Sequence, residues 1–423
     1  MTLARFLRFD QNKTIFTTLL SVTFAILFVD GINAFETTHW VAFFEAIFIA
    51  VWILSNVKES LYRIKKIFYS SKLKLIWLWL LAVTVSCVQL QIQFASTEHL
   101  TIANTRYFYL LVHLFFLVSA YLFLSSEKLE GDKILMIIPW GMLLISFFYL
   151  IIISSGIHSK SIFGNPPLFS HIRYAGYLAT VACVISIVRI VKGMALTDVK
   201  IDVFLLMINF TFLCWLGGRG SVLAIILTMM LLPLFFNIKT ILKPLLLVFT
   251  VCIFSLMLAE YLSIFRWNGL GRFLSIFSSD ISIDEYSSSR ISIWIGAIKG
   301  FINQPVLGLG PDGYKFMTER VWGMQPHNVI IQFLVEWGVV GASLILAIIY
   351  KFIALIVKHS LSSKQGLKLL LPSAVFFSLT FHGLTDGTYY HAQPVFMIML
   401  SVAIALSIIY PRYNVIQTSL KNR

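Results

Sequence analysis

The chain has 423 residues, of which 58% are hydrophobic and only 12% are charged, whereas a soluble domain is about 45–50% apolar and about 25% charged. This composition excludes an ordinary water-soluble enzyme, a disordered protein and a disulfide scaffold. The net charge of +14 would suggest nucleic acid in a soluble protein. In a membrane protein, basic residues first of all crowd the cytoplasmic loops, so no nucleic-acid partner is expected.

Twelve apolar runs predict an all-α integral membrane protein with about 12 transmembrane helices. The runs are too long, and alternate too little, for the strands of a barrel. The four cysteines all fall inside such runs without metal-binding spacing, which is typical of packing residues. In chain order the runs cover about 14–34, 40–56, 75–92, 107–124, 134–154, 174–191, 202–218, 221–236, 244–264, 338–357, 369–385 and 394–410.

The distribution of basic residues predicts the orientation of these helices. With the N-terminus in the cytoplasm, 23 of the 33 basic residues fall in cytoplasmic loops and tails, and the short loops of the other side hold 4. This bias follows the positive-inside rule and predicts that both termini are cytoplasmic. The basic start of the chain resembles a signal peptide, but no convincing small-residue cleavage site follows, so we expect an uncleaved first span.

One long segment departs from the pattern of spans and short loops. Residues 1–264 hold spans 1–9, residues 265–337 form a loop on the non-cytoplasmic side, and residues 338–423 hold spans 10–12 and the tail. A loop of this length needs secondary structure of its own. We therefore expect short helices within it, lying on or near the membrane.

Local signals place two helices in this loop. Ser287–Ser289 offers N-caps for an apolar helix that ends at Pro305, and the glycine-rich residues 308–313 form a turn cluster. A second helix is expected from Asn328, as its N-cap, with interruptions at Gly338 and Gly341.

Arg219 is the first candidate for chemistry, because it lies between glycines in the tight turn that joins spans 7 and 8. A charged group there is costly unless it faces water, lipid headgroups or an anion. A snorkelling topology anchor is the alternative, but anchors gather on the cytoplasmic side. We therefore predict that Arg219 binds an anion.

Arg290 lies in the first turn of the first loop helix. The free N–H groups and the dipole of a helix start favour anions, and a guanidinium adds a planar fork that matches phosphate. The alternative is a solvated loop arginine beside the acidic residues Asp280, Asp284 and Glu285.

His327 follows Pro326 and directly precedes the second loop helix. A lone histidine is more often a satisfied polar residue than a catalyst, and without an H-x-x-x-H partner we expect no metal ligation. Glu336 falls on the opposite face of the helix, so the pair is no simple dyad. The chain also has no Asp-x-Asp motif, which argues weakly against metal-dependent sugar transfer, and no metal or cofactor is predicted.

Further polar residues on the same side of the predicted membrane are candidates to line a cavity. The interfacial interpretation is favoured for each of them. They are His171, Arg173, Asp386, Tyr389, Tyr390 and His391.

The histidine segment carries a resemblance to a known family. His327 and Asn328, followed by nine residues and then by Gly338-x-x-Gly341, match the motif of O-antigen ligases. Arg219-Gly220 with the three residues that follow resembles the family's Arg-small-x-x-Leu segment, and the region around Arg290 resembles its large periplasmic loop. The sequence thus resembles the O-antigen ligase/polymerase superfamily of GT-C-like membrane glycosyltransferases.

The resemblance implies an activity and partners. A ligase of this family takes a glycan from its carrier, undecaprenyl pyrophosphate, and attaches it to lipid A–core at the periplasmic face of the bacterial inner membrane, without nucleotide or required metal. By position, Arg219 and Arg290 would hold the pyrophosphate and His327 would serve as the base. Membrane lipids surround the spans.

This chemistry agrees with what the residue types allow. The acceptor hydroxyl must lose a proton, which a histidine of pKa about 6.5 can take. Two permanently charged arginines can stabilise the pyrophosphate leaving group and offset its effect on the pKa of the histidine. A single displacement would invert the anomeric configuration.

Two other functions remain open at this stage. A polymerase of the same superfamily would use the same base and arginines with a growing glycan as acceptor. A polysaccharide transporter or lipid-linked oligosaccharide flippase would also suit twelve spans, and Glu45 lies within one, but no inverted repeat is evident. The sequence leaves open the glycan, the acceptor sugar, the oligomeric state and the hydrogen-bond partner of His327.

Overall fold

The structure is a computed structural model. Among the residues that it describes, the regular secondary structure elements are all helices. These are residues 3–28, 34–55, 57–68, 73–92, 96–127, 131–155, 168–169, 171–193, 199–231, 233, 238–261, 282–321, 323–360 and 366–411. The helices are α1 (Leu3–Phe28), α2 (Ala34–Ser55), α3 (Val57–Phe68), α4 (Lys74–Ile92), α5 (Thr97–Glu127), α6 (Gly131–Leu135), α7 (Ile137–Ser154), α8 (Ile172–Gly193), α9 (Lys200–Trp215), α10 (Arg219–Met230), α11 (Ile238–Tyr261), α13 (Ile283–Tyr286), α14 (Arg290–Asn303), the 3-10 helix η4 (Gly313–Phe316), α15 (Val329–Ser360), α16 (Gly366–His382) and α17 (Ala392–Ile409).

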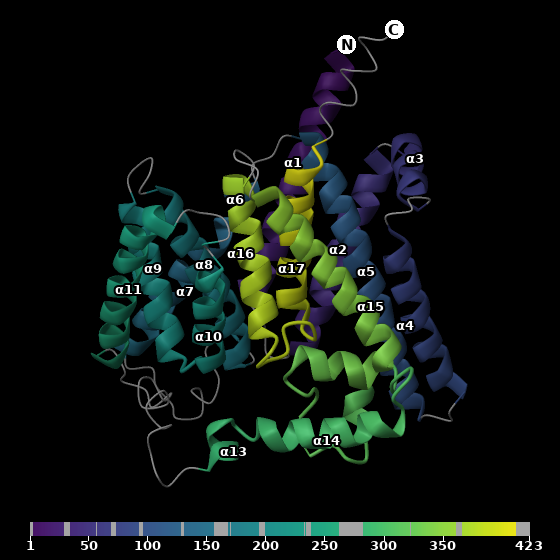
Figure 1. Cartoon of the computed structure of the whole chain (residues 1–423). Coiled ribbons are helices and arrows are strands. Elements are labelled where there is room, and N and C mark those ends of the chain that lie inside the picture. The colour runs from purple at the N-terminus through teal and green to yellow at the C-terminus, as the bar shows by residue number, and fades with distance from the viewer. Residues whose placement is uncertain are drawn as a thin grey trace.

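The long helices run side by side in one bundle (Figure 1). Helix α1 begins and helix α17 ends at the same end of the bundle, and α14 lies across the opposite end. Helix α8 is the central helix: 94% of its apolar stretch is buried, and it packs on α7, α9, α10 and α16. Helices α4 and α15 pack together on another flank.

An all-helical membrane protein is confirmed, but a count of twelve spans is not. The described residues of each predicted apolar run lie mainly on a helix, although residues 29–33, 56, 232, 234–236 and 262–264, which belong to four of these runs, are outside the described residues. Eight helices in the described part of the chain have the length and apolar character that crossing a membrane requires. The apolar parts of α1, α10 and α16 are shorter.

The predicted loop contains short helices where the structure describes it, since α13, α14 and η4 lie between residues 282 and 321. Its first part, up to residue 281, lies outside the described residues. Helix α14 ends at Asn303, just before Pro305 as expected, because proline cannot continue a helix. The four cysteines are free thiols within the bundle, in agreement with their prediction as packing residues.

Helix α15 is interrupted at Gly338, where φ is +62°, and this break explains the first motif glycine. The carbonyls of Val335 and Glu336 accept hydrogen bonds of 2.7 and 2.9 Å from the amides of Leu309 and Gly310. A Cβ at Gly338 would lie 2.2 Å from the carbonyl oxygen of Val306. Only glycine therefore allows the loop to dock on the opened helix.

The second expected interruption, at Gly341, does not occur, since Gly338 is the one non-helical position inside α15. Gly341 instead faces the preceding turn, where an added Cβ would lie 2.5 Å from the Cβ of Trp337. Beyond the break, the amides of Val339 and Val340 donate to the carbonyls of Pro305 and Val306. The break at Gly338 and the bonds that follow it thus hold residues 305–310 against α15.

Two buried carboxylates inside the bundle are paired with basic side chains. The Glu45 carboxylate of α2 lies 2.6 Å from Nδ1 of His113 on α5. Toward the end of the bundle where α1 begins, Arg189 of α8 contacts Asp202 of α9 at 2.7 Å. Such pairing is the usual way to place ionisable groups among apolar helices.

Candidate functional site

His327 stands between the loop and the start of α15, in a left-handed backbone conformation with φ of +53°. Asn328 caps α15, because its Oδ1 accepts the amides of Ile330 and Ile331 at 3.0 and 3.2 Å. Its Nδ2 donates to the carbonyl of Leu384 at 3.1 Å. The predicted N-cap is therefore correct, and it also ties this turn to the loop between α16 and α17.

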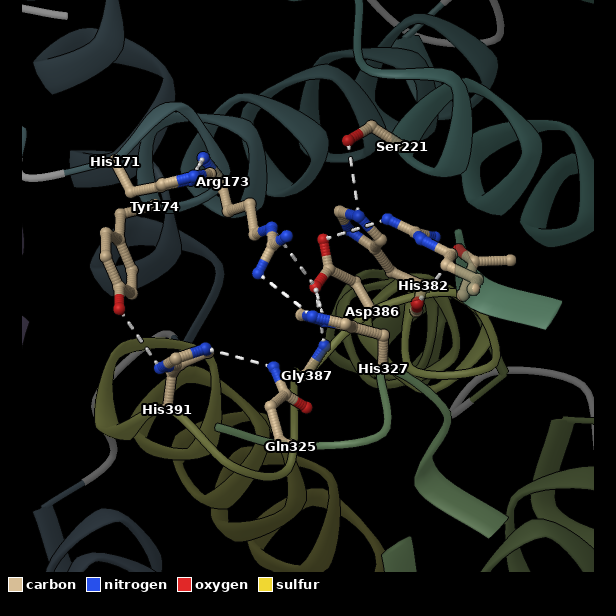
Figure 2. A network of polar contacts seen from close by, with 12 residues as sticks. His171, Arg173, Tyr174, Ser221, Gln325, His327, His382, Asp386, Gly387 and His391 are labelled. Atoms are coloured by element: carbon tan, nitrogen blue, oxygen red, sulfur yellow. Dashed lines mark hydrogen bonds and ion pairs between the residues drawn. The ribbon is translucent and has the colours of Figure 1, made fainter. Parts of the chain in front are cut away.

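The partner of the His327 ring is Asp386, from that same loop (Figure 2). Nδ1 of His327 lies 3.2 Å from Oδ1 of Asp386, and both side chains are buried. The amide of Gly387 donates to the same carboxylate oxygen at 2.8 Å. Glu336, as predicted, is not paired with His327; it accepts a hydrogen bond from Gln332 instead.

Two arginines contact this histidine–aspartate pair. Arg173 Nη1 lies 3.3 Å from Nε2 of His327, and Arg173 Nε lies 3.9 Å from Oδ1 of Asp386. Arg290 Nη2 lies 3.7 Å from Oδ2 of Asp386. Of the two arginines that the sequence singled out, Arg290 therefore lies in the cluster. Arg173, whose favoured interpretation was interfacial, lies there as well.

Arg219 lies beside this cluster. Its Nη2 donates to the Oγ of Ser288 at 3.3 Å, two residues before Arg290. Burial is the main cause that lowers the pKa of Arg290. The positive charges of Arg173 and then of Arg219 lower that pKa further. The structure thus brings Arg219 and Arg290 to the same end of the bundle, around the start of α14.

The backbone amides in the first turn of α14 already donate hydrogen bonds to side chains of the protein. The Arg290 amide donates to Ser287 Oγ at 3.1 Å, and the Ser292 amide donates to Asp284 at 3.0 Å. Hydrogen bonds from Ser292 hold the pKa of Asp284 below its usual value. Any anion binding at this helix start must therefore come from the guanidinium groups, and Asp284 serves the helix rather than Arg290. Asp280 lies outside the described residues.

Electrostatics fix the protonation state of the pair. Burial alone would raise the pKa of Asp386, but the hydrogen bond from His327 and the charges of Arg173 and Arg290 outweigh it and hold that pKa well below its usual range. Burial lowers the pKa of His327, and the two arginine charges lower it further against the opposing effect of Asp386. Asp386 is therefore ionised and His327 neutral at neutral pH.

Positive charge accumulates at this end of the bundle. Arg173, Arg219 and Arg290 lie in the first turns of α8, α10 and α14, where the helix dipole is itself positive and disfavours cations. Among the described residues, Arg173 and Arg290 share the carboxylate of Asp386. Two guanidinium groups that share one carboxylate suit a bound anion with several oxygens, such as a phosphate or pyrophosphate.

A second layer of side chains supports the pair. His391 accepts or donates hydrogen bonds on both ring nitrogens, with Tyr174 at 3.2 Å and Gln325 at 3.3 Å. Gln325 packs on Gly387, where an added Cβ would lie 1.8 Å from its Nε2. Of the other predicted polar residues, His171 accepts the amide of Arg173 at 3.1 Å.

Tyr389 bonds Thr380 at 2.9 Å, away from the pair. Within the part of the chain that the structure describes, no three His, Cys, Asp or Glu side chains gather as a metal site would require.

Apolar helices of this length and a charged cluster at one end of the bundle together define a multi-pass membrane protein. Residues 203–346 match the model of the O-antigen ligase family, and this match supports the resemblance of the sequence to the O-antigen ligase superfamily. No curated protein matches the chain. The matched span holds Arg219, Arg290 and His327, whereas Arg173 and Asp386 lie outside it.

Proposed function

We propose that this protein is an O-antigen ligase. It transfers a glycan from undecaprenyl pyrophosphate to lipid A–core at the periplasmic face of the bacterial inner membrane, with both termini in the cytoplasm. The observation that carries the proposal is the buried His327–Asp386 pair beside Arg290, on residues that largely fall within the family match. Nothing in the proposed reaction requires a metal or a nucleotide.

In this proposal His327 is the general base. Nδ1–H of His327 donates a hydrogen bond to Asp386, which leaves the lone pair on Nε2 to take the proton of the acceptor hydroxyl. As the hydroxyl oxygen bonds to the anomeric carbon, the bond from that carbon to the pyrophosphate oxygen breaks. The proton stays on Nε2, undecaprenyl pyrophosphate leaves, and the anomeric configuration is inverted in a single displacement.

Arg219 and Arg290 hold the pyrophosphate in this proposal. Both are permanently charged and lie at the starts of α10 and α14, where Arg219 bonds Ser288 just before Arg290. Arginine matches two phosphate oxygens at once, and the charge of the leaving group grows as the bond breaks. Because the leaving group is already a stabilised anion, no general acid is needed. Asn328 positions the turn that carries the histidine, Gly338 lets the loop dock on α15, and Gly341 packs against Trp337.

The test is transfer by purified protein with undecaprenyl-pyrophosphate-linked glycan and lipid A–core. His327→Ala is expected to reduce transfer at least about 100-fold, the usual contribution of a general base. His359→Ala is the matched control, because His359 bonds the Leu355 carbonyl near the far end of α15, and it should retain full transfer. NMR of the product should show an inverted anomeric centre. Wild-type transfer by His327→Ala would overturn the assignment.

A further inference from the structure

The lone pair that the proposed reaction needs is already occupied in the substrate-free site. Asp386 is ionised and accepts at Nδ1 of His327, so the ring proton is on Nδ1 and Nε2 is an acceptor. Arg173 Nη1 lies 3.3 Å from Nε2 and is always a donor. An acceptor hydroxyl must therefore displace this guanidinium before it can give up its proton.

We infer that Arg173 masks the Nε2 lone pair of His327 in the empty site and releases it when a pyrophosphate group binds, so that the base is available only in donor-loaded protein. This inference rests on the proposed function. It assigns Arg173 a positioning role that neither the family match nor the motif includes, since Arg173 lies upstream of residue 203.

The contacts of Arg173 are weak enough to be exchanged. Its bond to Nε2 joins a cation to a neutral nitrogen, and its contact with Asp386 is long, at 3.9 Å. The Arg173 side chain is 29% exposed, so a ligand can reach its guanidinium without entering the buried pair. Phosphate oxygens are anionic and accept two parallel N–H bonds from one guanidinium, so they bind it more strongly than a single neutral nitrogen does.

The geometry directs that exchange toward the predicted donor site. Arg290 shares the Asp386 carboxylate with Arg173, with contacts of 3.7 and 3.9 Å on its two oxygens. A pyrophosphate held by Arg290 therefore brings anionic oxygens next to the Arg173 guanidinium. When Arg173 turns to those oxygens, Nε2 is freed while Asp386 still holds Nδ1. The order of events is then donor first and acceptor second.

Chemical labelling of His327 reports the state of Nε2 directly. Diethyl pyrocarbonate acylates a free imidazole lone pair, and mass spectrometry of the peptide that contains His327 measures the rate. Inorganic pyrophosphate at about pH 8, where an ordinary histidine is neutral, is the probe for the donor. In wild-type protein pyrophosphate is expected to speed labelling of His327 about tenfold, the effect of losing about one hydrogen bond.

Two variants separate masking from other effects. Arg173→Ala should label at the fast rate without pyrophosphate, and pyrophosphate should no longer accelerate it. Lys299→Ala removes an exposed positive charge from α14 and should behave as wild type. His359 in each sample is the internal reference for reagent concentration.

Other results would overturn the inference. Pyrophosphate that only slows labelling of wild-type protein shows that Nε2 is not masked, and this measurement needs no variant to fold. Equal labelling rates for wild type and a folded Arg173→Ala protein also show that Arg173 does not mask Nε2. If the protein transfers the glycan but pyrophosphate does not change the labelling rate of His327, the masking inference is wrong and the ligase proposal is retained. If pyrophosphate speeds labelling but no glycan is transferred, the ligase proposal fails instead.

Discussion

Two arginine–aspartate networks contact the polypeptide between α16 and α17, and they differ in their charge balance. Around Asp386, two guanidiniums share one carboxylate through contacts of 3.7 and 3.9 Å. Around Asp312, one guanidinium, that of Arg106, lies 3.6 Å from the carboxylate and 4.3 Å above the ring of Tyr390. The Tyr390 hydroxyl donates to Asp312 at 2.8 Å.

The difference separates a site that suits a ligand from a joint that holds the fold. The Asp312 network is saturated, because Arg106 also donates to the Tyr390 carbonyl at 3.3 Å and the buried Glu336 adds a further acidic group. It ties α5 to residue 312 and to the start of α17. The Asp386 network keeps more positive than negative charge and includes a histidine that can exchange a proton. Substitutions should therefore affect catalysis in one network and stability in the other.

The largest effect on transfer, after the loss of His327, is expected for Arg290→Ala. Removing a charge that stabilises the leaving group should lower the transfer rate about 10²- to 10³-fold. Arg290→Lys should recover little of it, since an ammonium lacks the planar fork. Rates of glycan transfer and thermal midpoints in detergent, measured on the same preparations, test this. A loss of transfer matched by loss of folded protein would contradict the assignment.

Asp386→Asn should lower transfer by roughly 10- to 100-fold and change its pH dependence. Asp386 raises the pKa of His327, so its loss lowers that pKa further. The rate falls on the acid side as His327 becomes protonated, and the acid limb of the profile should therefore move to lower pH. A limb that stays in place, or moves to higher pH, would show that Asp386 does not act through His327.

Arg106→Gln should affect stability far more than transfer. Breaking one partner of a buried ion pair costs about 3–5 kcal/mol of folding free energy, and Asp312 has only 4% of its surface exposed. The rate per folded molecule should change only a few-fold, because neither residue contacts the His327–Asp386 pair in the described structure. A stable variant that has lost transfer would place this network in the reaction.

Asn328→Ala should have the smallest effect. Asn328 is a motif residue beside His327, yet its side chain caps α15 and holds the Leu384 carbonyl. Loss of an N-cap costs about 1 kcal/mol. Chemical denaturation should show this loss, while transfer falls much less than in His327→Ala. A hundredfold loss of transfer would assign Asn328 a direct part in the chemistry.

Much of the bundle follows from the sequence, because apolar runs and breakers are local signals. The runs, the helix end before Pro305, the cap at Asn328 and the break at Gly338 all appear where their residue types predict them. The predicted break at Gly341 was wrong, since a glycine marks close packing as readily as a bend. The number of spans depends on whether the shorter apolar helices α1, α10 and α16 cross the membrane completely, and hydropathy alone does not determine this.

The geometry of the candidate site could be anticipated from the sequence only in the part that the family resemblance covers. Arg173 and Asp386 reach His327 across 154 and 59 residues of sequence, and no periodicity reports such a contact. One signal was available for Asp386: it is the sole acidic residue after Glu336. A lone acid beside a membrane-spanning run needs a cationic or hydrogen-bonding partner, and Arg173 was one of the few basic residues on its side.

Attachment of a finished glycan to lipid A–core is tested most directly in a strain that lacks the protein. Lipopolysaccharide from that strain, separated on a gel, should show bare core, while glycan accumulates on undecaprenyl pyrophosphate. The wild-type gene should restore the long ladder, and His327→Ala should not. Core that carries a single repeat unit would contradict the proposed ligase and identify a polymerase instead.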